Sequence, residues 1–394
     1  MSRQEPGADA GRILQVEPLV ATACARVDSD DFGGDSWREG LERLVQSLNT
    51  EAALNETGMS SMTDQILACL VNRLQIERCY ARHPEIADQQ IVAPLFGLGL
   101  PRTGSTALSF LLAQDPARRS LRVWEAQAPC PPPVTATEGS DERIAAAQRG
   151  IDVTNELFPG LAGMLPSAAD GPIECLILLA LDFKSLLFEG MARVPTYSSW
   201  LMTCDMVPAY RYHERVLKLL QWRCPPTRWS LKTPAHMLSI DALDSVYPDA
   251  RFVMTHRRVG DVLASVCALY ETFISILADR CDPIEIGMHN SDTWRTAVTR
   301  VLAFRDRGNE SRFHDLFFAS LQRDPLGEIA RLYDGLGEPL SESARLRMSA
   351  WAASNAEDRR APGQYPAARF GLDPARIAAD FEFYHDRFHL SDEH

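Results

Sequence analysis

The chain has 394 residues, enough for one large α/β domain or two smaller ones, and its 45% apolar and 24% charged content is typical of a globular protein. The 53 acidic and 40 basic residues give a net charge of −13, which argues against nucleic acid as a partner. Nine cysteines without CxxC pairs or Cys/His clusters indicate reduced thiols in a cytoplasmic protein and no metal site. The polar N-terminus argues against a signal peptide. The longest apolar stretch, 173–188, contains charged residues and is too interrupted to span a membrane.

The predicted elements begin with helices over residues 1–89. Within them, residues 64–82 carry apolar side chains at helical spacing, namely Ile66, Leu67, Leu70, Leu74 and Ile76. Residues 90–99 (QIVAPLFGLG) form a short apolar run that ends in glycines, the pattern of a buried parallel strand. Residues 105–114 (STALSFLLAQ) follow as an apolar helix. A strand, a glycine turn and a helix form the first unit of an α/β sheet.

The prolines of residues 129–133 exclude a helix there. Residues 140–222 are mostly helical in pattern, which we interpret as an insertion over the active edge of the sheet. Further strands are predicted at residues 228–231 and 250–255. A helix is predicted over 261–273, and residues 292–390 read as helices joined by Pro/Gly turns.

These elements predict one domain over residues 1–394, built on a P-loop-like, mostly parallel α/β sheet flanked by helices. A helical N-terminal extension covers 1–89. The nucleotide-binding core covers 90–275 and includes the insertion at about 140–222. A helical part, 276–394, completes the chain.

Residues 99–106 (GLPRTGST) have the glycine spacing of a Walker A loop, which turns backbone N–H groups toward an anion at a helix N-terminus. Ser105 stands where a nucleotide triphosphatase needs lysine. With Arg102 supplying positive charge, the loop suits one 5′-phosphate and its transferable group. Its candidate contacts are Arg102, Thr103, Gly104, Ser105 and Thr106. The alternative is a glycine turn that only joins strand to helix.

A second candidate anion site follows the strand at 250–255. Arg257 lies at the end of that strand, Asp261 is a candidate helix N-cap, and Ser265 lies one turn later. Arg257 and Ser265 can converge on one phosphate at the carboxyl edge of the sheet. The alternative is a surface arginine and a helix cap. Together the two sites suit a nucleotide phosphorylated at both its 5′ and 3′ ends.

These motifs resemble those of the 3′-phosphoadenosine-5′-phosphosulfate (PAPS)-dependent sulfotransferases, in particular their bacterial branch. Residues 101–106 are similar to that family's 5′-phosphosulfate loop, and Arg257…Asp261…Ser265 has its R-x-x-x-D-x-x-x-S spacing for the 3′-phosphate. Residues 229–236 (WSLKTPAH) and 247–252 (YPDARF) are similar to further stretches of the bacterial branch. The resemblance covers most of the chain from about Trp37. It implies PAPS as co-substrate and 3′,5′-ADP as product.

The chain departs from the family pattern in two places. The family often has histidine before a C-terminal tyrosine in an Arg/Gly-rich loop, where this chain has Gln364 before Tyr365. Arg359, Arg360 and Tyr365 stay candidates for nucleotide contact. Arg258 and the valine after it replace the family's usual acidic residue and proline, although the Arg257–Ser265 spacing is kept.

The resemblance also suggests roles in an in-line sulfuryl transfer without a metal ion. Lys232 and Arg102 would stabilise the leaving oxygen. The general base would be His236 or Glu125, and the sequence does not choose between them. Each has a structural alternative, local packing for His236 and an arginine salt bridge for Glu125. A set of aromatic residues either lines an acceptor pocket or belongs to the core: Tyr197, Trp200, Tyr210, Tyr212 and Trp222.

Two other classes compete with this interpretation. An ATP-dependent P-loop kinase of a small molecule needs the Walker lysine, which is Ser105 here. A binding module without activity predicts loss of Arg102, Lys232 or Arg257, and all three are present. The acceptor is left open as a small molecule, lipid or carbohydrate that offers a hydroxyl or amine. Oligomeric state is also left open, with a homodimer as one alternative.

Overall fold

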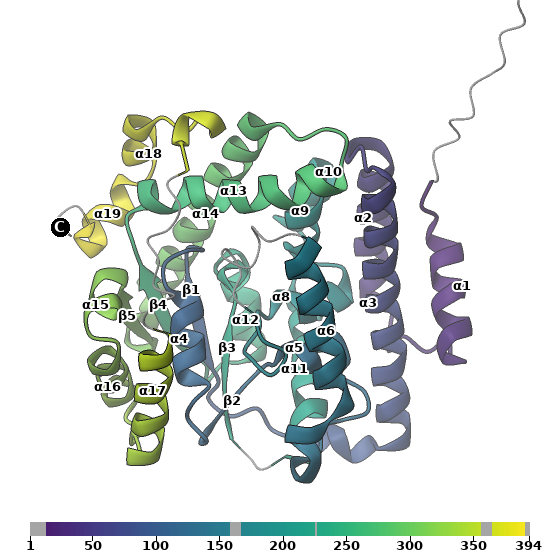
Figure 1. Ribbon diagram of the computed structural model, residues 1–394, viewed down its shortest axis with the longest axis horizontal. Coiled ribbons are helices and arrows are strands. Elements are labelled where there is room, and N and C mark those ends of the chain that lie inside the picture. Colours follow the sequence, from purple (N-terminus) through teal and green to yellow (C-terminus); the bar gives the residue numbers. More distant parts are fainter. Residues whose placement is uncertain (1–12, 158–166, 225–226, 356–364, 391–394) are drawn as a thin grey trace, which may run out of the picture.

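A single parallel sheet of five strands organises the protein (Figure 1). The computed structural model describes residues 13–157, 167–224, 227–355 and 365–390. The strands lie in the spatial order β2-β3-β1-β4-β5, and their bounds are Leu95–Gly99 (β1), Arg118–Ser120 (β2), Arg228–Lys232 (β3), Arg251–His256 (β4) and Phe313–Phe317 (β5). All pairings are parallel. The predicted α/β class is confirmed.

The central strand β1 lies between β3 and β4, so the loops that follow these three strands lie next to one another. Every residue of β1 is buried, as expected for a parallel strand covered by helices on both faces. In the register, Gly97 pairs with Lys232 of β3, and Gly99 pairs with Thr255 of β4. Because the strands are parallel, the carboxyl ends of β3, β1 and β4 lie side by side at one edge.

The start of β1 differs from the prediction, which extended it back to residue 90. Pro94 offers no N–H to a neighbouring strand. Ala93 before it has a positive φ of 42°, and its N–H donates to Asp249 Oδ2 at 2.7 Å. The chain therefore turns at these residues, and pairing begins at Leu95.

Two strands were missed, and both lie at the edges of the sheet. β2 has three residues, and β5 interrupts the region 292–390 that was expected to contain only helices. The short sequence of β5 (FHDLF) gains its burial by pairing with β4, for example Phe252 with Phe313. Such pairing is a long-range contact that local pattern does not reveal.

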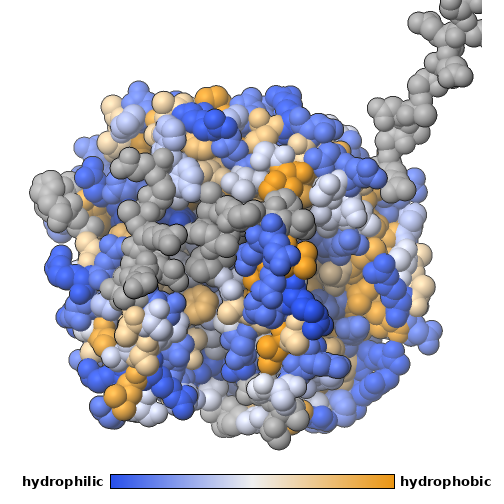
Figure 2. Space-filling model, in the orientation of Figure 1, coloured by the Kyte–Doolittle hydropathy of each residue, from blue (hydrophilic) through white to orange (hydrophobic). Residues whose placement is uncertain are grey.

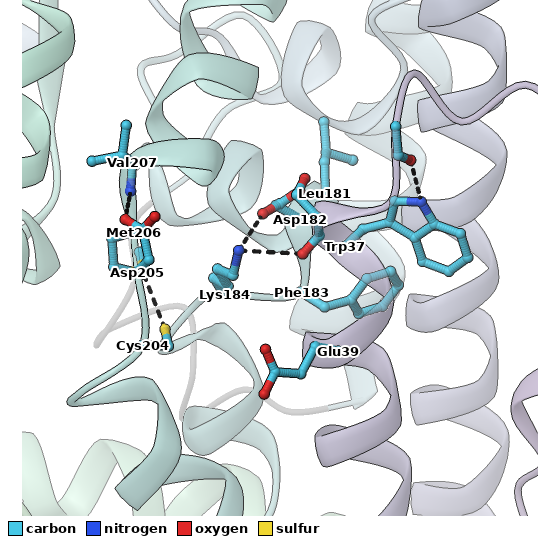
Figure 3. Close-up of polar contacts among 12 residues, drawn as sticks. Trp37, Glu39, Leu181, Asp182, Phe183, Lys184, Cys204, Asp205, Met206 and Val207 are labelled. Atoms are coloured by element: carbon cyan, nitrogen blue, oxygen red, sulfur yellow. Dashed lines mark hydrogen bonds and ion pairs between the residues drawn. The ribbon is translucent and has the colours of Figure 1, made fainter.

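The predicted helical N-terminal extension consists of α1 (Val16–Val27), α2 (Ser36–Glu51) and α3 (Glu56–Arg82), which stand at one side of the molecule in Figure 1. A buried ionic cluster attaches them to the inserted segment (Figure 3). There the Asp182 carboxylate accepts hydrogen bonds from Arg73 Nη1 of α3 (2.9 Å) and from Lys184 Nζ (2.9 Å).

The remaining elements are helices and short helical turns. Helices of the core and the insertion are α4 (Ser105–Leu112), α5 (Val123–Gln127), α6 (Glu142–Leu157), α8 (Leu176–Leu179), α9 (Leu187–Met191), α10 (Pro195–Leu201), α11 (Val207–Gln221), α12 (Ile240–Val246) and α13 (Val259–Leu277). Those of the C-terminal part are α14 (Pro283–Phe304), α15 (Phe318–Arg323), α16 (Pro325–Leu336), α17 (Glu342–Ser354), α18 (Pro374–Asp380) and α19 (Glu382–Phe388). Short 3-10 turns lie at η1 (Pro84–Asp88), η2 (Thr135–Ser140), η3 (Ala180–Asp182), η4 (Pro234–Ser239), η6 (Glu310–Arg312) and η7 (Ala367–Phe370), with a π turn at η5 (Arg305–Asn309). The proline run is not helical, as predicted.

Helices cover both faces of the sheet. On one face, α4, α16 and α17 pack against β1, β4 and β5 through a buried apolar cluster that includes Leu108, Val253 and Ile329. On the other face a larger core joins β1, β3 and β4 to the N-terminal extension, the insertion and α14. On the side viewed in Figure 2, hydrophilic residues predominate and apolar residues form small, separated patches.

Among the described residues, α13 is the one helix long and apolar enough to cross a membrane by length and composition. Half of its most apolar window is buried inside the structure, and the core helix of a globular protein passes the same test. Residues 173–188 contain α8, η3 and part of α9 rather than one long helix.

Candidate functional site

The loop between β1 and α4 has the backbone of an anion-binding turn. Gly99 has a φ of 121°, and a Cβ atom there would lie 2.4 Å from the Thr255 carbonyl oxygen, so only glycine fits beside β4. Gly104, with a φ of 89°, precedes α4, whose first residue is Ser105. Arg102 has a φ of 67°, a strained conformation for a residue with a side chain. The N-terminus of α4 thus opens at the carboxyl edge of the sheet.

The two threonines of this loop have different surroundings. Thr103 is fully buried, and its hydroxyl donates to the Leu100 carbonyl at 2.6 Å and lies 2.6 Å from Thr255 Oγ1. Its side chain therefore braces the loop, and a ligand would meet only its backbone. Thr106 is half-buried, and its hydroxyl lies 3.5 Å from Lys232 Nζ.

The structure brings the second predicted anion site into contact with the first. Arg257 directly follows β4, and its Nη1 donates to the Arg102 carbonyl at 3.3 Å. Ser265, buried on α13, accepts a hydrogen bond from Arg102 Nε at 3.2 Å. Burial lowers the pKa of Arg102, and the charge of Tyr365 opposes that shift.

Asp261 is not the N-cap that the sequence predicted. Helix α13 begins at Val259, which makes Arg258 the N-cap and puts Asp261 in the first turn. Arg258 has a ψ of 132°, which is not helical, and the helix begins at the next residue. Asp261 is exposed there, and its carboxylate favours the positive end of the helix.

Lys232 ends β3 beside the phosphate loop. A Cβ atom on Gly97 would lie 3.1 Å from Lys232 Cγ, so this glycine leaves room for the lysine side chain. Lys232 Nζ donates to Glu174 Oε1 at 2.7 Å, and Thr233 Oγ1 donates to Glu174 Oε2 at 2.8 Å. The Glu174 side chain is 30% exposed.

Glu174 was missed as a functional candidate in the sequence. In the sequence, Glu174 stands out only as a charge within an apolar stretch, and it lies 58 residues from Lys232. The fold brings the two together because the backbone N–H of Cys175 donates to the Lys232 carbonyl at 2.9 Å. A carboxylate next to a lysine and a phosphate loop can accept a proton from a bound hydroxyl.

The two predicted bases, His236 and Glu125, are both fully buried. Nδ1 of His236 lies 2.8 Å from the Tyr210 hydroxyl, and its Nε2 has no partner among the described residues. Burial holds the pKa of His236 well below its usual range, with His213 adding to the shift. Glu125 forms an ion pair with Arg119, and its other oxygen accepts from the Arg122 N–H at 3.3 Å.

The other predicted site residues are divided between the core and the undescribed part of the chain. Arg359 and Arg360 lie outside the described residues. The aromatic residues Tyr197, Tyr210 and Tyr212 are buried in the core rather than lining a pocket. Trp200 donates to Glu39 at 3.0 Å, and Trp222 packs on His83. No group of three metal-ligating side chains occurs within the described ranges.

A cavity of about 230 Å³ lies farther along α13, where it meets α9, α10 and α14. Tyr270 lines it, five residues after Ser265 on the same helix, which is about 7.5 Å along the axis. The apolar part of its wall consists of Ala192, Val194, Pro195, Ile274, Ile286 and Met288. The polar part includes His289, whose Nε2 lies 3.0 Å from Glu189 Oε2.

Comparisons with known proteins agree with this geometry. The sequence pattern of the sulfotransferase family matches residues 94–342 of this chain. The sulfotransferase STF9 of Mycobacterium avium is 33% identical, with a TM-score of 0.88 over 96% of this chain and 98% of that one. STF1 of Mycobacterium tuberculosis is also 33% identical, with a TM-score of 0.84 over 94% and 98% of the two chains. A comparison with curated protein sequences found no match. The match to the family over residues 94–342 and the likeness to these two structures show that the chain belongs to the sulfotransferase family.

Proposed function

We propose that this sulfotransferase takes its sulfuryl group from PAPS and that its two anion-binding motifs hold opposite ends of that nucleotide. The observation that carries the proposal is the contact between the motifs, with Arg102 bonded both to Ser265 and to Arg257. The 5′-phosphosulfate would lie in the loop, against Arg102, Thr103, Gly104, Ser105 and Thr106. The 3′-phosphate would bind Arg257 and Ser265, because guanidinium and hydroxyl groups both donate to phosphate oxygens. Tyr365, whose charge acts on Arg102, stays a candidate contact for the same nucleotide.

Lys232 and Arg102 are the cations we assign to the leaving group. When bound, PAPS supplies a sulfuryl group whose transfer leaves negative charge on the bridging oxygen. A lysine fixed at a strand end needs little reorganisation to stabilise such charge. Lys232 is paired with Glu174, and the sulfate of a bound PAPS would compete with this carboxylate for the lysine.

Glu174 is the general base we favour. It lies against Lys232 and Thr233 and keeps 30% of its side chain exposed. His236 and Glu125 stay candidates from the sequence, but a substrate hydroxyl would need to enter the core to meet either one. A base must come within hydrogen-bond reach of the proton that it accepts.

The acceptor we expect is a small alcohol or phenol with an apolar body. The support is the cavity farther along α13, whose wall combines aliphatic side chains with several polar ones. A screen of labelled PAPS against apolar alcohols, phenols, sugars and amines should give most transfer with the first two classes. Preferential sulfation of sugars would contradict this part of the proposal. The cytoplasm, where PAPS is available to an enzyme with reduced thiols, is the compartment we propose.

Nucleotide preference tests the donor. In a thermal-shift experiment, 3′,5′-ADP without metal should stabilise the protein more than Mg-ATP does, because a ligand that binds only the folded state raises its stability. Preferential stabilisation by Mg-ATP would instead support the kinase alternative and overturn the choice of PAPS.

Arg257→Ala tests how the nucleotide is oriented. It should weaken 3′,5′-ADP binding by about tenfold to a hundredfold, the loss of a charge-assisted phosphate contact, while 5′-AMP binding changes little. Isothermal titration with both nucleotides makes the comparison. Equal loss for the two would show that Arg257 does not bind the 3′-phosphate.

A further inference from the structure

Two thiols far apart in the sequence lie against each other near the base of the N-terminal extension. Cys79 belongs to the last turn of α3, and Cys130 precedes Pro131 in the proline run that follows α5. Their sulfur atoms are 3.3 Å apart, and both residues are half-buried. No other two cysteine sulfurs in the described part of the chain, which includes all nine cysteines, form such a contact.

The backbone holds both thiols in place. Arg143 of α6 donates from Nη1 to the Ala128 carbonyl at 2.7 Å and to the Pro131 carbonyl at 2.6 Å, so the chain is held before and after Cys130. The Cys79 carbonyl accepts the His83 N–H at 2.9 Å at the end of α3. The contact between the sulfurs therefore joins two anchored segments.

Three arginines favour a thiolate at Cys79, whereas the bond with Cys79 and burial raise the pKa of Cys130. The hydrogen bond with Cys130 lowers the pKa of Cys79, and the guanidinium groups of Arg82, Arg223 and Arg78 lower it further. A thiolate is the nucleophilic form of cysteine, and a low pKa together with access to solvent is the usual property of thiols that oxidise readily.

We propose that Cys79 and Cys130 form a site of reversible oxidation that closes to an intramolecular disulfide, with hydrogen peroxide as the oxidant. The Cys79 thiolate attacks one peroxide oxygen, takes up a proton and becomes a sulfenic acid, with release of one water. The Cys130 sulfur then attacks the sulfenic sulfur, the S–S bond forms, and the hydroxyl leaves as a second water with the Cys130 proton. Two thiols and one peroxide thus become one disulfide and two waters.

The disulfide would tie α3 to the segment behind α5 across 51 positions of sequence. The sulfurs need to approach by about 1.3 Å to reach bonding distance, a movement within reach of side-chain rotation. A cross-link over a loop of this length restricts the unfolded chain, so we expect the oxidised protein to melt several degrees higher than the reduced one. The site lies apart from Lys232 and Glu174, and this inference does not depend on the proposed donor.

Peptide mapping of the full-length protein tests the proposal. After treatment with a few equivalents of hydrogen peroxide, the intact mass should fall by about 2 Da, and a non-reducing digest should contain one cross-linked peptide pair joining Cys79 to Cys130. Dithiothreitol should restore the original mass and thermal midpoint. Alkylation by iodoacetamide should lose two sites on oxidation and regain them on reduction.

Matched variants give the control. Cys79→Ser and Cys130→Ser should each abolish the mass loss and the thermal shift, whereas Cys281→Ser, at another half-buried thiol, should keep both. Because the wild-type map needs no variant, a folding defect in one serine protein leaves the test intact. A gain of oxygen on Cys79 without a cross-link, a cross-link to Cys224, or full alkylation after oxidation would overturn the proposal.

Discussion

Lys232 and Lys184 each form an ion pair with a carboxylate, and the two pairs have almost the same length, 2.7 Å to Glu174 and 2.9 Å to Asp182. Their surroundings differ. The Glu174 side chain is 30% exposed, whereas Asp182 is fully enclosed beside Lys184 (Figure 3) and also accepts from Arg73. The first pair lies at the carboxyl edge of the sheet, and the second joins the N-terminal extension to the insertion.

This difference in exposure separates a carboxylate expected to stabilise the fold from one expected to take part in the reaction. The Asp182 carboxylate is satisfied by Arg73, Lys184 and the Ser36 hydroxyl (2.5 Å), so no capacity is left for a ligand. Lys232 has one strong partner and a hydroxyl of the phosphate loop at 3.5 Å. Breaking the buried Asp182 network should affect stability, and breaking the partly exposed Lys232–Glu174 pair should affect turnover.

The largest effect is expected from Asp182→Asn. The variant leaves the Arg73 and Lys184 charges buried without their counter-charge, which costs about 3–5 kcal/mol of unfolding free energy. Urea denaturation measures the loss. A variant as stable as the wild type would show that this cluster does not hold the N-terminal helices.

Lys232→Ala should come next, with an effect on catalysis rather than folding. Removing a group that stabilises transition-state charge lowers kcat by about 10²–10³-fold. Its urea midpoint and its affinity for 3′,5′-ADP should stay near the wild-type values. Transfer of labelled sulfate from PAPS to an active alcohol or phenol gives kcat. A proportional loss of 3′,5′-ADP binding would assign Lys232 to nucleotide binding instead.

Glu174→Gln should lower kcat by about 10²-fold, the smaller end of what a general base contributes, because the amide keeps the shape but accepts no proton. Glu125→Gln is the matched control: it breaks a fully buried ion pair and should lower stability instead. If Glu125→Gln or His236→Ala reduced turnover in a stably folded protein while Glu174→Gln did not, the base would be one of those two residues.

The smallest effect is expected at the surface pair Arg38–Glu42, 3.0 Å apart on α2, with side chains 40% and 52% exposed. Glu42→Gln should change the unfolding free energy by about 0.5 kcal/mol or less, since solvent screens such pairs. The same urea titration applies. A loss comparable to that of Asp182→Asn would show that exposure does not separate these pairs.

The glycine loop between β1 and α4 could be predicted because its signals are local. The glycines of residues 99–106 and the strand before them specify a turn that any sheet of this kind would contain. The spacing of Arg257 and Ser265 follows from one strand end and one helix turn, and the contact of that pair with Arg102 follows from strand order. The same local reasoning missed β5, because five residues carry too little pattern without their partner strand.

What the sequence determined by itself, then, was the α/β class and the places of the two candidate anion motifs, since both rest on periodicity and on residues close together in the chain. Only the tertiary structure decided which titratable side chains are enclosed in the core and which stay partly exposed at the edge of the sheet. It buried His236 and Glu125 with partners of their own, and it placed Glu174, 58 residues away, against Lys232. The physical reason is that burial and long-range pairing are properties of the packed chain, and the chemistry of a carboxylate or an imidazole depends on them.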